Sequence, residues 1–122
     1  MTILPKVTNF GIAIGISFID YNKDGEMDIV VNRTGDGTGP YAFYQGYYIQ
    51  VLKNTSGVFT DVTATVMSQN ANINAPKWVN WYRIQDVNSD GWPDITSDDK
   101  YYGLVWINNN GFFTKQSNST GY

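Results

Sequence analysis

The sequence predicts an all-β protein made of two copies of one four-stranded antiparallel unit. Three observations predict it. The pattern D-x-N-x-D-G-x-x-D occurs at residues 20–28 and again at 86–94, each time followed by isoleucine. Segments on both sides of each copy alternate apolar and other residues, which is the periodicity of β-strands. Aromatic residues make up 16% of the chain and it has 12 glycines, which suits strands joined by many turns.

The first unit contains four predicted strands. They cover residues 11–20, 28–33, 47–53 and 58–62. In the first of them the larger residues alternate with small ones, so one face is predicted to carry Ile12, Ile14, Ile16 and Phe18. The second strand is apolar on both faces, which predicts that it is covered on both sides.

The second unit repeats this order. Its predicted strands cover residues 78–85, 94–97, 102–108 and 112–114. The loops are 66 positions apart but the third strands align at a shift of 55, so the first unit carries 11 extra residues within about residues 34–46. We expect core positions for Trp78, Trp81 and Trp106, and a half-exposed Trp92. The resulting division is an N-terminal segment 1–9, units 10–63 and 77–117, a connector 64–76 and a tail 118–122.

Each acidic loop has the ligand spacing of a calcium site. Calcium takes six to eight oxygen ligands at about 2.3–2.6 Å. Side chains at loop positions one, three, five and nine and a backbone carbonyl at position seven supply oxygens, and the glycine at position six permits a sharp turn. The predicted ligands are Asp20, Asn22, Asp24, Glu26 and Asp28 in one loop and Asp86, Asn88, Asp90, Trp92 and Asp94 in the other. We expect two structural Ca²⁺ ions, one per unit.

Each loop has two alternative interpretations. An EF-hand places a bidentate glutamate at position twelve and a helix on each side. Position twelve is Val31 in the first copy and Ser97 in the second, and the flanking residues are typical of strands. A turn of aspartate, asparagine and glycine that binds no metal stays open as the alternative.

Composition argues against several classes of function. The chain has no cysteine and no histidine, so it lacks thiol chemistry and the commonest general base. The net charge is −3, and Lys and Arg are scattered singly, which argues against a nucleic-acid partner. No apolar run is long enough to span a membrane, and residues 1–9 lack the features of a signal peptide. The adjacent carboxylates Asp98-Asp99 are typical of a turn rather than of an acid–base pair. Because histidine and cysteine are also absent, we expect no enzyme.

Four short antiparallel strands per unit, repeated every 55–66 residues, are typical of β-propeller blades. The predicted fold is therefore two four-stranded blades, each with a calcium loop between its first and second strands. Propellers close with about four to eight blades. The remaining blades would come from the same protein, from copies of this chain or from a partner chain.

The sequence resembles the FG-GAP/VCBS repeats of integrin-like β-propellers. Phe10-Gly11 is similar to the Phe-Gly that names the motif, and residues 20–31 resemble its calcium loop and second strand. Residues 51–63 resemble the stretch that closes bacterial VCBS repeats. The second copy departs from the pattern, with Lys77-Trp78 in place of Phe-Gly and Pro93 after Trp92. The resemblance covers about residues 10–117.

This resemblance implies a secreted or cell-surface, calcium-binding module for adhesion or recognition that is not catalytic. One alternative is a carbohydrate-binding, lectin-type propeller. Another is a structural subunit that completes a propeller by oligomerisation or with partner chains. The ligand, protein or glycan, is not specified by such repeats.

The extra residues of the first unit are the candidate ligand site. They combine aromatic rings with amide and carboxylate groups, a mixture found in sugar-binding surfaces and in protein interfaces. The residues concerned are Asp36, Tyr41, Phe43, Tyr44 and Gln45. The alternative is that these rings fill space between two blades.

Overall fold

The computed structural model describes residues 4–39, 42–73, 75, 78–97 and 103–116. The all-β prediction is confirmed for them: two antiparallel sheets account for the regular structure, with one short helix. The strands of the first sheet are β1 (Ile12–Ile19), β2 (Asp28–Thr34), β3 (Tyr47–Thr55), β4 (Val58–Asp61) and β5 (Ala71–Asn72). Those of the second are β6 (Tyr82–Gln85), β7 (Asp94–Ser97), β8 (Val105–Asn109) and β9 (Phe112–Gln116), and α1 is Thr63–Val66.

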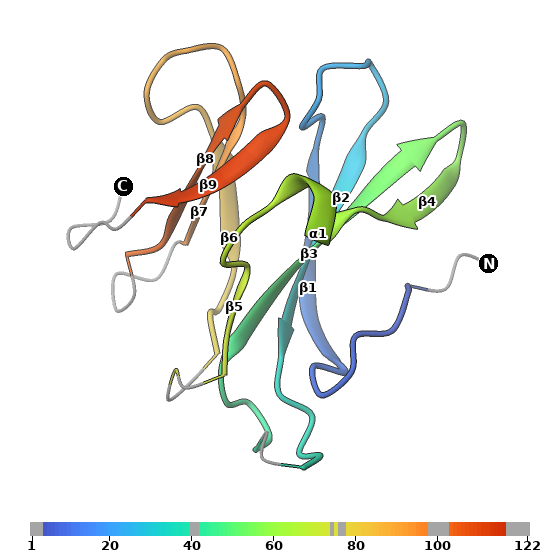
Figure 1. Ribbon diagram of the computed structural model, residues 1–122, viewed down its shortest axis with the longest axis vertical. Coiled ribbons are helices and arrows are strands. Elements are labelled where there is room, and N and C mark those ends of the chain that lie inside the picture. The colour runs from blue at the N-terminus through green and yellow to red at the C-terminus, as the bar shows by residue number, and fades with distance from the viewer. Residues whose placement is uncertain (1–3, 40–41, 74, 76–77, 98–102, 117–122) are drawn as a thin grey trace.

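Both sheets run in sequence order, as expected for consecutive hairpins. The first has the order β1-β2-β3-β4 and the second β6-β7-β8-β9. The predicted connector is not only a linking segment, because it contains α1 and β5, and β5 pairs with β3. Figure 1 shows the two sheets side by side, with α1 and the segment after it crossing between them.

The expected single apolar face on β1 is wrong in one respect. The pairing of β1 with β2 shifts between Ala13 and Gly15, which leaves Ile14 as a bulge. A one-residue bulge reverses the face of every residue before it. Ile16 and Phe18 therefore share a face with their partners on β2, whereas Ile12 lies on the opposite face.

The strand pairings also correct the alignment of the two units. Asn54 pairs with Phe59 in the first sheet, and Asn108 pairs with Phe113 in the second. These pairs are 54 positions apart, not 55, so the first unit carries 12 extra residues. Equivalent positions are then Leu52 and Trp106 on the third strands.

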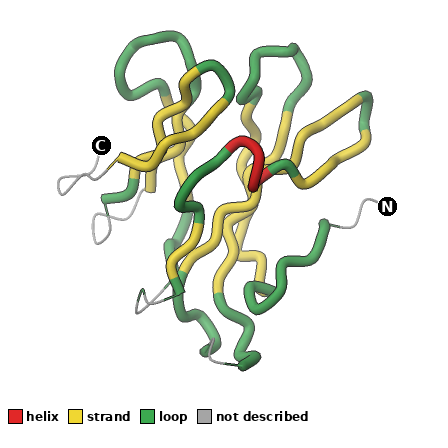
Figure 2. The backbone as a smooth tube through the Cα atoms, viewed as in Figure 1, coloured by secondary structure: helices red, strands yellow, loops and turns green. Residues whose placement is uncertain are grey.

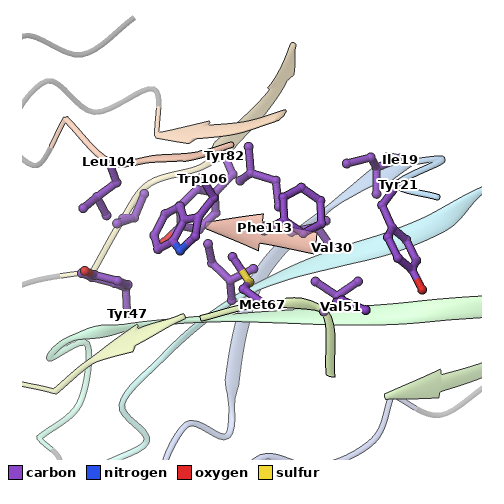
Figure 3. Packing of buried hydrophobic residues seen from close by; sticks show 14 of the residues in the cluster. Ile19, Tyr21, Val30, Tyr47, Val51, Met67, Tyr82, Leu104, Trp106 and Phe113 are labelled. Carbon is purple, nitrogen blue, oxygen red and sulfur yellow. The ribbon is translucent and has the colours of Figure 1, made fainter. Parts of the chain in front are cut away.

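The main core lies between the two sheets. Trp106 is fully buried, and its ring meets those of Tyr47 and Tyr82 edge-on, with centroids 6.2 and 6.1 Å away. Figure 3 shows these rings with Met67 and Phe113, which α1 and β9 bring into the same cluster. Burying apolar surface stabilises a protein by about 25 cal/mol per Å². This core is therefore the main contribution to the packing of the two sheets on each other.

The opposite face of the first sheet is covered in part by the N-terminal segment. A smaller cluster there joins Ile29, Val31 and Leu52 to Leu4 and Phe59. The buried guanidinium of Arg33 donates to the carbonyl oxygens of Pro5 and Phe10 and to Gln50. These bonds tie residues 5–10 to β2 and β3.

Two of the three tryptophans expected in the core lie at the surface. Trp106 is buried as predicted, but Trp78 is 37% exposed and Trp81 58% exposed. The reason is that the first strand of the second sheet begins at Tyr82, four residues later than its pattern suggested. No helix within the described part of the chain is long and apolar enough to cross a membrane.

Candidate metal centres

The two acidic loops lie at the same end of the molecule. Each connects the first and second strands of its sheet, β1 to β2 and β6 to β7. In Figures 1 and 2 both loops are at the top, whereas the described part of the extra segment, residues 35–39 and 42–46, lies at the bottom. The repeat therefore places two similar sites next to each other and far from the candidate ligand residues.

The first loop is shaped by its own carboxylates. The two oxygens of Asp20 accept hydrogen bonds from the backbone N–H groups of Asp24 and Gly25, at 3.2 and 3.0 Å. Asp24 accepts from the N–H of Glu26 at 2.9 Å. Gly25 has φ = 89°, in the left-handed region that favours glycine. The backbone turns so that Asp20, Asp24 and Asp28 each bring a carboxylate oxygen within 4.8 Å of the others.

Asp28 is the innermost ligand candidate of the first loop. Its side chain is fully buried, and its Oδ1 accepts a 2.8 Å hydrogen bond from the N–H of Asn54. Its Oδ2 is buried and forms no hydrogen bond of good geometry within the described residues, although the backbone N–H of Tyr21 acts to lower the pKa of Asp28. A buried carboxylate oxygen without a partner costs several kcal/mol unless something compensates it. A cation bound between the three carboxylates is the compensation that this geometry supports.

The second loop repeats the arrangement of carboxylates, but both oxygens of its buried aspartate accept hydrogen bonds. The oxygens of Asp86 accept from the N–H groups of Asp90 and Gly91, at 3.2 and 2.8 Å, and Asp90 accepts from Trp92 at 2.9 Å. Asp94 is fully buried, and its oxygens accept from Asn108 at 2.7 Å and Val87 at 2.9 Å. Here too one oxygen from each aspartate lies within 4.8 Å of the other two.

The pKa shifts separate the inner from the outer aspartates. Burial raises the pKa of Asp28 and of Asp94, and the charges of their loop neighbours add to the rise. The N–H of Glu26 lowers the pKa of Asp24, and that of Gly91 lowers the pKa of Asp86. Asp24 and Asp86 thus favour the ionised form, while Asp28 and Asp94 need a positive charge nearby to ionise as readily.

The donor set fits a hard cation. Each loop offers three carboxylates and an asparagine amide, and the carbonyls of Glu26 and Trp92 stand at position seven. All are oxygen donors, which calcium prefers, and neither loop offers a sulfur or imidazole ligand. The side chain of Glu26 has another role, because its Oε1 accepts a 2.7 Å hydrogen bond from the N–H of Ser56. Asn22 is half-buried and Asn88 is exposed.

Sequence reasoning missed two residues that hold the inner aspartates. Asn54 and Asn108 are the residues before the last in the third strands, and each donates its backbone N–H to the buried aspartate of its own unit. Each also accepts from a glycine N–H three residues later, at 2.8 Å in both units. The repeated N-x-x-G spacing at Asn54–Gly57 and Asn108–Gly111 was the signal that identifies them.

The two loops differ in their nearest cation. Lys53 forms an ion pair of 3.2 Å with Asp24 in the first loop. The equivalent residue of the second unit is Ile107, which carries no charge. Lys53 therefore offsets part of the negative charge of the first loop, and a metal ion bound there would compete with it for Asp24.

Some of the candidate ligand residues of the extra segment make contacts that stabilise the fold. Asp36 accepts hydrogen bonds from Gly11 and Thr38, and the amide of Gln45 donates to the carbonyl of Ile73 at 3.0 Å. Phe43 is 67% exposed, and Tyr44 packs on Trp78 with ring centroids 5.3 Å apart. Tyr41 lies outside the described residues. Among the described candidates, Phe43 and Tyr44 are the ones whose side chains are exposed.

Comparisons of the chain with protein-family models, with curated proteins and with solved structures find no match.

Proposed function

We propose that this chain is a calcium-stabilised recognition or adhesion module that acts outside the cell without catalysis. The observation that carries the proposal is the first loop, where Oδ2 of Asp28 is buried without a well-formed hydrogen bond and three carboxylates converge. Calcium bound there, and at the matching aspartates of the second loop, would turn binding free energy into folding free energy. Loops of this kind suit the high calcium concentration outside cells, where modules bind with Kd of about 10⁻⁴–10⁻³ M.

Thermal melting in Ca²⁺, in Mg²⁺ and in EGTA tests the metal. At a calcium concentration about 100 times Kd, each site should add about 2.7 kcal/mol to the free energy of unfolding. Mg²⁺ is the control, because it prefers a smaller octahedral site and keeps several of its waters. Equal melting temperatures in Ca²⁺ and in EGTA would show that the loops are turns without a metal.

We further propose that the two sheets are blades of a β-propeller. The second sheet packs on the first through the face that carries Tyr82, which is only 5% exposed. The equivalent residue of the first sheet is Ile16, which is 50% exposed, and its neighbour on that face, Phe18, is 59% exposed. This difference supports the presence of a further sheet. It would pack on the exposed face of the first sheet in the way that the first sheet packs on the second. Isolated repeats generally need about three units for stability.

This exposed face favours a second role, a structural subunit that completes a propeller with copies of itself. Sedimentation equilibrium in calcium tests it, with Phe18→Lys compared with the wild type. A ring should dissociate when a charge enters the face, while Val58→Lys, at an exposed position of β4, should not change the mass. A wild-type chain that is a monomer at all concentrations would exclude self-assembly and assign any missing blades to another source.

The exposed pair of Tyr44 and Trp78 supports glycan binding as the alternative form of recognition. Aromatic rings at a surface can stack on the apolar face of a sugar, and Nε1 of Trp78 already donates to Asn80 at 3.0 Å. A glycan array with the calcium-loaded protein distinguishes the alternatives. Binding that is lost in Trp78→Ala and kept in Trp81→Ala would favour a lectin, and an array without signal would favour a protein ligand.

A further inference from the structure

Asn108 connects the two candidate metal centres. Its backbone N–H donates to Oδ1 of Asp94, the buried ligand of the second loop, at 2.7 Å. Its side-chain Nδ2 donates to the carbonyl of Tyr21, at position two of the first loop, at 2.8 Å. The same nitrogen donates to the carbonyl of Pro93 at 3.0 Å. One buried residue thus holds the backbone of one loop and a ligand of the other.

Asn54 provides an internal comparison. Asn54 makes three hydrogen bonds within its own unit that match bonds of Asn108. It donates to Asp28 at 2.8 Å and to Met27 at 3.0 Å, and it accepts from Gly57 at 2.8 Å. Asn108 has the corresponding bonds to Asp94, Pro93 and Gly111, and adds the one to Tyr21. The bond to Tyr21 is therefore the feature that distinguishes the linking asparagine from its copy.

Two further contacts join the loops. Nζ of Lys23, at position four of the first loop, lies 4.3 Å from the centre of the Trp92 ring, at position seven of the second. The turn after β8 also approaches the first loop, since a Cβ at Gly111 would lie 3.7 Å from Cβ of Asn22. Figure 1 shows the β8–β9 turn between the two loops.

We propose that Asn108 is a positioning residue shared by both sites, through which calcium at one site raises the affinity of the other. This inference rests on the proposed function, calcium binding by both loops. The buried Oδ2 of Asp28 supports it in the first loop, and the converging carboxylates of Asp86, Asp90 and Asp94 support it in the second. Ordering either loop fixes Asn108, so the second ion orders fewer groups when it binds. Couplings of this kind typically change affinity by about 5- to 150-fold, and we expect the lower end for one hydrogen bond and a ring contact.

Electrostatics between the loops acts in the opposite direction. An ion in one loop reduces the negative charge that attracts an ion to the other. Salt at 0.15 M screens exposed charges over about 8 Å. The measurement is therefore made at that ionic strength, and Asn108→Ala preserves every charge, so it separates the effect of the hydrogen bond from that of the ions.

Calorimetric titration with Ca²⁺ tests the coupling in the wild type, Asn108→Ala and Asn54→Ala. Each background is also titrated with Asp24→Ala or Asp90→Ala, which leaves one working site. In the wild type the product of the two binding constants should exceed the product of the single-site constants about fivefold. Asn108→Ala should lose most of this excess, and Asn54→Ala should keep it. An equal excess in wild type and Asn108→Ala, or none in wild type, would overturn the proposal.

The design separates this inference from the proposed function. No heat of calcium binding in any variant would overturn the proposed function itself, and with it the coupling. Two independent sites in the wild type would overturn only the coupling. A second measurement does not need Asn108→Ala to fold. In the Asp24→Ala chain, calcium at the second site should still shift the backbone amide NMR signal at Tyr21, and an unchanged signal would contradict the link.

Discussion

The side-chain amide of Asn108 donates a 2.8 Å hydrogen bond to the carbonyl oxygen of Tyr21, which lies 87 residues earlier in the chain. Tyr21 is itself buried, and its ring lies 6.3 Å from that of Phe113. The contact between the two sheets therefore continues from the apolar core to the base of the acidic loops. The stability of the core and the shape of the candidate metal centres depend on the same interface.

Loss of a loop aspartate should remove the calcium response of one site. Asp24→Ala and Asp90→Ala each delete one proposed ligand, so each should lose up to about 2.7 kcal/mol of stability at calcium concentrations 100 times Kd. In EGTA both should melt close to the wild type, because the ion pair of Asp24 with Lys53 is half-exposed and contributes little. Asp36→Ala, which removes the same charge outside the loops, is the control. A full calcium shift in both loop variants would rule out these ligands.

Calcium affinity should fall in mild acid. Burial first, and then neighbouring aspartates, raise the pKa of Asp28 and of Asp94. A folded protein with such an acid holds the proton more tightly than the unfolded chain, so the calcium-free form loses stability as pH rises through the raised pKa. Calcium must displace that proton. As the pH falls, the Kd for calcium should therefore begin to rise while the pH is still above the ordinary aspartate pKa of about 3.9. Titrations between pH 7 and about 4 check this, and a constant Kd would contradict it.

A methyl group at Gly46 should be costly. Gly46 has φ = 77°, and a Cβ there would lie 2.6 Å from the carbonyl oxygen of Asn72, in the strand that pairs beside it. Gly57 has φ = 88° with no atom within 4 Å of the added Cβ, so Gly57→Ala measures backbone strain alone. Gly46→Ala should be less stable than Gly57→Ala by about 1–3 kcal/mol. Equal urea midpoints for the two variants would exclude the clash.

Two tryptophans that the sequence predicts for the core should respond differently to removal. Trp106 is fully buried between Tyr47 and Tyr82, so Trp106→Ala should cost about 3–5 kcal/mol. Trp81 is 58% exposed, and Trp81→Ala should stay within about 0.5 kcal/mol of the wild type. Chemical unfolding of both variants in calcium measures the difference. A large loss for Trp81 would place the second sheet differently from the structure.

Much of the candidate site was predictable because its spacing is local. The converging aspartates follow from five positions within nine residues, and the turn follows from the glycine at position six. The asparagines that hold Asp28 and Asp94 come from the third strands, 26 and 14 residues further along the chain. Their role depends on strand register. The alignment of the two units by sequence places the third strands one residue away from the register that the strand pairings show.

The sequence was enough to predict most of the strands, the turns and the two acidic loops, because alternation and turn residues act over a few neighbouring positions. Which faces are covered follows from the tertiary structure alone. The bulge at Ile14 sends Ile12 to the opposite face from Ile16, and the late start of β6 leaves Trp81 at the surface while Trp106 enters the core. It also placed Asn108 beside Tyr21. Burial depends on contacts between residues far apart in the chain, and local periodicity does not encode those contacts.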